Sequence, residues 1–221
     1  MFVGHYAASL MLKQVDRRLS LGWLFLAVQF VDILFFPLVL LGIERLNIVE
    51  NYTASTHFEL VYMPFTHSLV ASFIWAFIVY GGVRLLSRKQ RWFYPAAAGA
   101  MALAVLSHWF LDLLVHTPDL PLLGDSSLKL GLGLWNHALA TYLLEAGLLM
   151  LGLFLYLKST RGSGFLGKYG MIMFTVFLLL ANGHNIFGPP MGESVAALSV
   201  SALMSYFGFA GLAFWLDRYR H

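Results

Sequence analysis

Six long apolar stretches divide this chain, and each one is long enough to cross a lipid bilayer. A membrane-spanning helix needs roughly 20 apolar residues. Because 59% of the 221 residues are hydrophobic and only 11% are charged, a water-soluble globule and a disordered chain are both excluded. The sequence predicts an all-α polytopic membrane bundle that forms one integral-membrane domain over residues 1–221. The expected transmembrane helices are residues 20–42, 64–86, 94–116, 134–157, 168–187 and 194–216.

The first apolar segment is too short to span a bilayer. We expect residues 4–14 to form a half-membrane helix, because a polar turn at residues 16–18 follows it directly. This helix would pair antiparallel with the first half of span 20–42. His5 lies about 12 residues before the turn and Asp32 about 14 residues after it, so both side chains reach a similar depth at a rise of ~1.5 Å per residue.

The basic residues predict the orientation in the membrane. Twelve of the 14 Lys and Arg lie in four segments: before the first span, between spans two and three, between spans four and five, and at the C-terminus. Only Arg45 and Lys129 lie elsewhere. Lys and Arg are retained on the cytoplasmic side, so we expect both termini to be cytoplasmic. The expected location is the bacterial inner (plasma) membrane, with the lipid bilayer as a partner. Basic residues grouped in short clusters between apolar runs do not form a nucleic-acid module.

Ionisable side chains occur inside the predicted spans, where each costs roughly 2.5–3.5 kcal/mol. Each one is therefore a candidate functional residue. Pro64 is expected near the first position of its helix, which would put His67 inside that helix. His108, Asp112 and His116 recur every four residues and share one helix face. The topology puts Asp32 and Glu145 near the middle of the bilayer. It puts six residues in the outer half: His67, His108, Asp112, His116, His137 and His184.

Histidine and aspartate together, in a chain without cysteine, are the ligand set of zinc or another divalent metal with nitrogen and oxygen ligands. A dication would also neutralise the buried carboxylates. Since five candidate ligands exceed the three of a single catalytic zinc, a two-metal site stays open. The predicted ligands are His5, Asp32, His67, His108 and Asp112. The predicted acid/base or supporting residues are Asp112, His116, Glu145 and Gln29.

An isolated histidine in a membrane bundle more often makes a hydrogen bond between helices than it binds a metal. For His57, His137 and His184 we expect this structural or interfacial role.

Several short motifs resemble the inner-membrane metal-dependent hydrolase family (YdjM-like). They are Gly-His-Tyr at residues 4–6, Asp32, Phe-Thr-His-Ser at residues 65–68 and Ser-His-Trp-Phe-Leu-Asp at residues 107–112. That family shows an N-terminal Thr-His, a Pro-Asp-x-Asp, an Arg-Gly-x-Thr-His-Ser and a Ser-His-x-x-x-Asp in this order. The resemblance covers about residues 1–116 and implies a metal site in a hydrolase.

The sequence also departs from the family pattern. Val31 replaces the proline before the first Asp, and Leu34 occupies the position of the second Asp. Met63 and Pro64 stand where Arg-Gly is expected. The loss of one expected ligand favours one metal ion over two.

Two classes of function fit these observations. The first is a membrane-embedded hydrolase whose site opens to the outer leaflet, where a metal-activated water attacks a lipid-like or amphipathic substrate. The second is a transporter or an ion- or proton-translocating protein that uses the same polar residues. Further alternatives are haem ligation by two histidines and a role as an accessory subunit of a larger membrane complex. A second copy of the chain, in a homo-oligomer, is a candidate partner.

Overall fold

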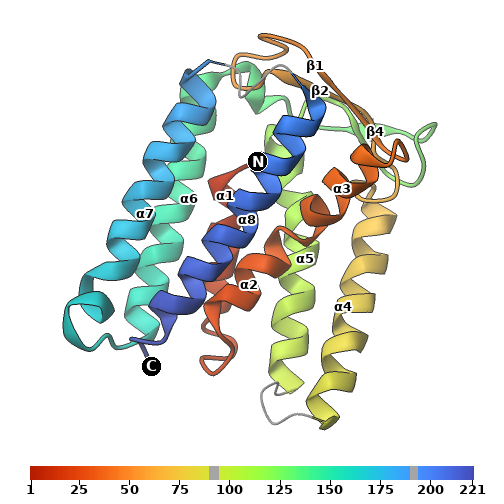
Figure 1. Cartoon of the computed structure of the whole chain (residues 1–221). Helices are drawn as coiled ribbons and strands as arrows, with labels where there is room; N and C mark the ends of the chain where they lie inside the picture. The colour runs from red at the N-terminus through yellow and green to blue at the C-terminus, as the bar shows by residue number, and fades with distance from the viewer. Residues whose placement is uncertain (90–94, 190–193) are drawn as a thin grey trace.

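The computed structural model describes residues 1–89, 95–189 and 194–221, and these residues contain eight α-helices and two short β-hairpins (Figure 1). Five helices are long and apolar enough to cross a membrane, and a bent pair of shorter helices counts as a sixth span if the two cross it together. The predicted all-α polytopic bundle is therefore confirmed. The span predicted over 94–116 starts at Tyr94, which lies outside the described residues. The five long helices are α4 (Leu69–Lys89), α5 (Pro95–Val115), α6 (Ala138–Ser159), α7 (Gly164–Phe187) and α8 (Val195–Asp217).

The first span is not continuous. The helices α2 (Leu21–Val28) and α3 (Phe30–Leu40) meet at Gln29 with a bend of 49°. Pro37 lies inside α3 and does not mark the break. The bend places Asp32 in the first turn of α3, where the helix dipole stabilises a carboxylate.

The short helix α1 (Val3–Leu12) lies inside the bundle and is buried on nearly all sides. It contacts α2 through Ser9, whose hydroxyl donates to the carbonyl of Leu24 at 3.0 Å. It also lies close against α6, because a side chain at Gly152 would come within 2.9 Å of the Ala7 carbonyl oxygen. The predicted half-membrane helix is present. The first residue lies within the bundle, with its amino group 2.6 Å from Asp112, and the cytoplasmic placement of both termini stays a prediction (Figure 1).

Both hairpins lie at one end of the bundle, here called the hairpin end (Figure 1). Strand β1 (Arg45–Ile48) pairs antiparallel with β2 (Phe58–Tyr62), and β3 (Leu120–Pro121) pairs antiparallel with β4 (Lys129–Leu130). The turn after α1, the α6–α7 connection and the C-terminus lie at the opposite end, here called the C-terminal end (Figure 1). The hairpins therefore cover the end of the bundle toward which α5 and α7 run.

Two predicted helix starts are wrong. Residues 64–68 form a turn before α4, so Pro64 is not the first helical residue and His67 precedes the helix. Glu44 fixes this turn, because its Oε1 accepts hydrogen bonds from the amides of Phe65 and Thr66. Burial raises the pKa of Glu44, and these hydrogen bonds limit the rise because they favour the ionised form.

The second displaced start is that of α6. A short 3₁₀ helix, η1 (Leu134–Asn136), occupies the beginning of the predicted span. His137 then lies at the N-cap of α6, with its side chain exposed, instead of inside a transmembrane helix.

A buried ion pair joins the elements at the C-terminal end. Lys13 Nζ, in the turn after α1, lies 2.6 Å from Asp217 Oδ2, and the side chains are only 4% and 5% exposed. Asp217 also accepts hydrogen bonds from the Leu21 amide and the Tyr156 hydroxyl. One carboxylate therefore connects α8, α6 and the start of α2.

Candidate metal centre

Two groups of His and Asp side chains, all buried except the partly exposed Asp32, lie next to each other in the bundle. In the first, Asp32, His67 and His108 offer ligand atoms within 4.8 Å of one another. In the second, His5, His108 and Asp112 do the same. The structure thus brings together all five residues predicted as ligands, from α1, α3, α5 and the turn before α4. These groups could hold a metal ion.

The distances between neighbouring ligand atoms are those of a tetrahedral metal site. His67 Nε2 lies 3.2 Å from Asp32 Oδ1, and His108 Nε2 lies 3.6 Å from the same oxygen. His108 Nε2 is also 3.1 Å from Asp112 Oδ2. Ligands bound to zinc at ~2.0–2.1 Å in a tetrahedron are separated by roughly 3.3 Å. Neighbouring ligand atoms are therefore spaced as zinc ligands are, in two groups of three side chains that share His108.

The hydrogen bonds of the histidines fix their tautomers. His108 Nδ1 lies 2.7 Å from the carbonyl oxygen of Val28, which can only accept, so Nδ1 carries the proton. His67 Nδ1 lies 2.8 Å from the Thr66 hydroxyl, which already donates to Glu44 and so must accept from the imidazole. In both rings Nε2 is left facing the carboxylates. Such an outer hydrogen bond is the usual companion of a metal-binding histidine.

The Nε2 atoms of His5 and His108 make no hydrogen bond within the described part of the chain, although both are fully buried. Each faces a carboxylate oxygen at 3.1 Å. Two atoms that both offer lone pairs repel at this distance unless a cation lies between them. The cation is either a proton on the imidazole or a metal ion.

The two aspartates differ in their remaining contacts. Asp32 Oδ2 accepts a hydrogen bond from the hydroxyl of Tyr206 on α8, at 3.0 Å. Asp112 Oδ1 faces three groups: the Met1 amino group at 2.6 Å, His5 Nε2 at 3.1 Å and His116 Nε2 at 3.6 Å. His5 therefore faces the oxygen of Asp112 that points away from His108, and its ring stacks on that of His108 at 3.9 Å.

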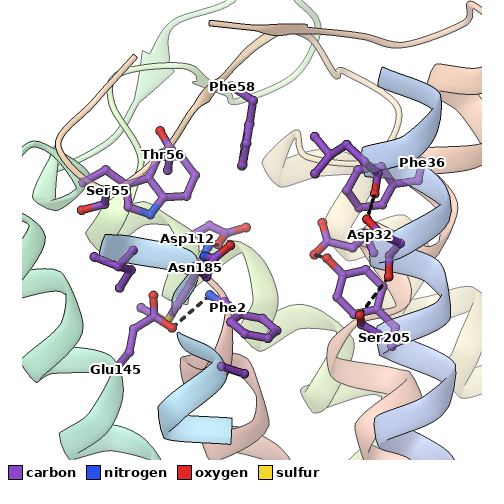
Figure 2. A pocket seen from close by; sticks show the side chains of 18 of the residues that line it. Phe2, Asp32, Phe36, Ser55, Thr56, Phe58, Asp112, Glu145, Asn185 and Ser205 are labelled. Atoms are coloured by element: carbon purple, nitrogen blue, oxygen red, sulfur yellow. Dashed lines mark hydrogen bonds and ion pairs between the residues drawn. The ribbon is translucent and has the colours of Figure 1, made fainter. Parts of the chain in front are cut away.

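A pocket of about 390 Å³ opens beside the two groups. Asp32 and Asp112 lie on facing sides of it, and Glu145 lies beyond Asp112 (Figure 2). Thr56 and Phe58, from the segment that leads into β2, cover it toward the hairpin end (Figure 2). The two carboxylates therefore form part of the pocket wall.

His116 lies at the edge of this pocket and is held by a second carboxylate. Its Nδ1 donates to Asp119 Oδ1 at 2.8 Å, and its ring packs on Trp135 with centroids 4.0 Å apart. The free Nε2 faces Asp112. This arrangement of carboxylate, imidazole and free nitrogen is suited to acid/base chemistry.

Glu145 lies on α6 and accepts hydrogen bonds at Oε2 from the amides of Phe2 and Gly4, both at 3.0 Å. These are backbone groups at the start of α1, which has no side-chain cap of its own. Glu145 therefore anchors the helix that carries His5.

This contact predicts how two Glu145 variants differ. Glu145→Ala leaves both amides unpaired and should weaken metal binding by ~10–100-fold, as loss of a supporting hydrogen bond does. Glu145→Gln keeps an oxygen acceptor and should restore most of the affinity. Titration of each purified variant with zinc measures the difference. If Glu145 were instead a catalytic acid or base, both variants would bind the metal fully and neither would turn over substrate.

The remaining predicted residues lie apart from both groups. His184 lines the pocket from α7, whereas His57 Nδ1 accepts a hydrogen bond from the Asn51 amide in the loop of the first hairpin. Gln29 is buried at the break between α2 and α3. The supporting and catalytic roles of Gln29, Asp112, His116 and Glu145 stay predictions.

Sequence reasoning missed three polar residues of the centre: Glu44, Asp119 and Tyr206. Asp119 had a usable signal, since it follows His116 by three residues in a His-Thr-Pro-Asp sequence. Glu44 stands in a polar loop and Tyr206 in an apolar span, where neither differs from an ordinary loop or span residue.

No family model, curated protein or solved structure matches this chain. The resemblance to the YdjM-like family stays a prediction from short motifs.

Proposed function

We propose that this integral membrane protein is a metal-dependent hydrolase, of the zinc type, that acts on a lipid-like or amphipathic substrate. One observation carries the proposal: three buried imidazoles, His67, His108 and His116, donate Nδ1–H outward and direct Nε2 toward two aspartates. Histidines that only formed hydrogen bonds between helices would not need to share this orientation of Nδ1 and Nε2. The resemblance to the YdjM-like family supports the same reaction class.

The centre is proposed to hold one ion. His108 belongs to both groups of candidate ligands, but its Nδ1 is committed to the Val28 carbonyl and its Nε2 offers one lone pair. It can therefore bind only one metal at a time. The proposed ligands are Asp32, His67 and His108, and Asp112 with His5 forms the neighbouring group around the same imidazole.

A bound divalent cation supplies a water of lowered pKa and polarises an ester, amide or phosphoryl group. The chain's own residues supply the proton transfers. His116 Nε2 can accept or release a proton at the pocket edge, because Asp119 holds its other nitrogen. The wall that carries Trp135 and Phe58 restricts water around these groups.

A buried apolar layer favours a hydrolase over a transporter. On each of three helices, apolar side chains separate the centre from the ion pair at the C-terminal end: Leu10 on α1, Leu24 on α2, and Leu149 and Leu153 on α6. A translocation path would need polar groups through this layer.

The basic residues support the proposed location. If the C-terminal end faces the cytoplasm of a bacterial inner membrane, the pocket and both hairpins face outward. The substrate would then come from the outer leaflet or the outer side.

The test is metal analysis of the purified protein. We expect about one zinc or similar divalent ion per chain, because one histidine is shared by both ligand groups. A chelator should lower the thermal midpoint, and zinc should restore it, since a ligand that binds only the folded state stabilises it. Wild-type protein that neither contains nor binds a divalent ion would contradict the proposal and favour a proton network.

Turnover adds a second readout. Metal-loaded protein in detergent is assayed on p-nitrophenyl acyl esters and p-nitrophenyl phosphorylcholine. We expect His116→Ala to lose turnover by about 10²–10⁴-fold with its metal content intact, as removal of an acid/base group does. His137→Ala is the matched control, because this exposed histidine contacts neither group.

A further inference from the structure

The helices α7 and α8 are closely packed at one end and separated by the pocket at the other. Near the C-terminal end, a side chain at Gly170 would come within 2.7 Å of Leu216, and one at Gly167 within 2.5 Å of the Tyr219 carbonyl oxygen. Phe177 and Phe209 then meet with ring centroids 6.0 Å apart. Beyond these rings the two helices line the pocket.

The part of the pocket between α7 and α8 is a slot whose walls carry apolar residues together with five polar ones: His184, Asn185, Ser201, Ser205 and Tyr206. Its residues recur at helical spacing, with Phe177 and Ala181 on α7 and Leu198, Ala202 and Phe209 on α8. The small side chains of Ala181 and Ala202 leave the width of the slot free.

The length of the slot matches one leaflet of a bilayer. On α8 the lining runs over residues 198–209, which corresponds to roughly 16 Å at ~1.5 Å per residue. The hydrocarbon core of a bilayer is about 30 Å thick, so one leaflet contributes about 15 Å. The slot runs from the aromatic pair near mid-span to the hairpin end.

The outward faces of the same helices are also apolar. Leu180 on α7 and Met204 on α8 are 69% and 71% exposed and, in a membrane span, face lipid. The two helices that line the slot therefore face hydrocarbon on their outer sides, and on the inner side Tyr206 of α8 contacts Asp32 of the candidate metal centre.

We propose that this slot binds the acyl chain of a membrane phospholipid, which moves in sideways between α7 and α8. The chain would end at Phe177 and Phe209, and the polar part of the lipid would lie beside Asp32 and Asp112. This inference rests on the proposed function only for the fate of the polar part. Binding of the chain itself needs no metal.

The experiment uses the full-length protein in phosphatidylcholine vesicles that contain a phospholipid with a photoactivatable diazirine in its acyl chain. After irradiation, labelled peptides are mapped by mass spectrometry. We expect excess labelling of residues 177–186 and 198–209 at positions that line the slot, over positions on the outward faces. Equal labelling of both faces would overturn the inference.

Variants that fill the slot sharpen the result. Ala181→Trp and Ala202→Trp should each abolish the excess, whereas Leu180→Trp and Met204→Trp add the same ring on the outward faces and should preserve it. Excess labelling that survives both slot variants would overturn the inference. His108→Ala should keep the excess, so failure of metal binding and failure of lipid binding are distinguished.

Discussion

Replacing His108 by alanine is expected to raise the dissociation constant for zinc by at least about 100-fold, more than the usual loss of a supporting residue. His108 is the one residue common to both ligand groups, and its Nε2 faces both aspartates. Isothermal titration of purified, chelator-treated protein with zinc measures the change. Asp32→Asn, which keeps the shape of the side chain, should weaken binding in the same direction.

His137→Ala serves as the control for this prediction, since it removes an exposed imidazole from the same chain. Its zinc affinity should equal that of the wild type. If His108→Ala folds with an unchanged thermal midpoint and binds zinc as tightly as His137→Ala, the ion is not held at this centre. The proposed ligand assignment would then be wrong.

The second large effect is expected at the other end of the bundle. Asp217→Ala should lower the free energy of unfolding by about 3–5 kcal/mol, because it leaves the Lys13 ammonium buried without its counter-charge. It also removes the acceptor of the Leu21 amide and the Tyr156 hydroxyl. Denaturant unfolding in detergent micelles measures the loss.

The chain provides a matched control in Asp125, whose ion pair with Lys129 has a similar distance, 2.8 Å, but side chains that are 40% and 32% exposed. Asp125→Ala should cost less than about 1 kcal/mol, as surface ion pairs do. The double variant Lys13→Met, Asp217→Leu should recover much of the stability, since no unpaired charge remains. Equal losses for Asp217→Ala and Asp125→Ala would show that burial of the pair does not matter.

The spans and the grouping of the candidate ligands could be predicted from the sequence because each depends on local pattern. A bilayer imposes one length and one composition on a helix, so hydropathy alone identified the span of α7 or α8. The spacing of His108 and Asp112 put both side chains on one face of α5, and the position of the polar turn after α1 brought His5 to the depth of the centre. These inferences needed no knowledge of helix packing.

The break at Gln29 and the partners of the ligands could not be predicted in this way. Residues 21–28 are apolar throughout, residues 30–40 are apolar apart from Asp32, and the one proline, Pro37, lies away from the break. Glu44 holds the turn before His67 from 22 residues away, and Tyr206 reaches Asp32 across 174 residues. Such pairs depend on how the helices pack, and sequence spacing carries no information about them.

The position of α1 has a consequence for the order in which the protein assembles. The partners of its first turn, Asp112 on α5 and Glu145 on α6, emerge from the ribosome long after it, and 141 residues separate Gly4 from Glu145. A contact of such long range forms late. During synthesis α1 must wait until α5 and α6 have been inserted before it can dock. The nascent protein therefore stays without its completed centre until most of its spans have reached the membrane.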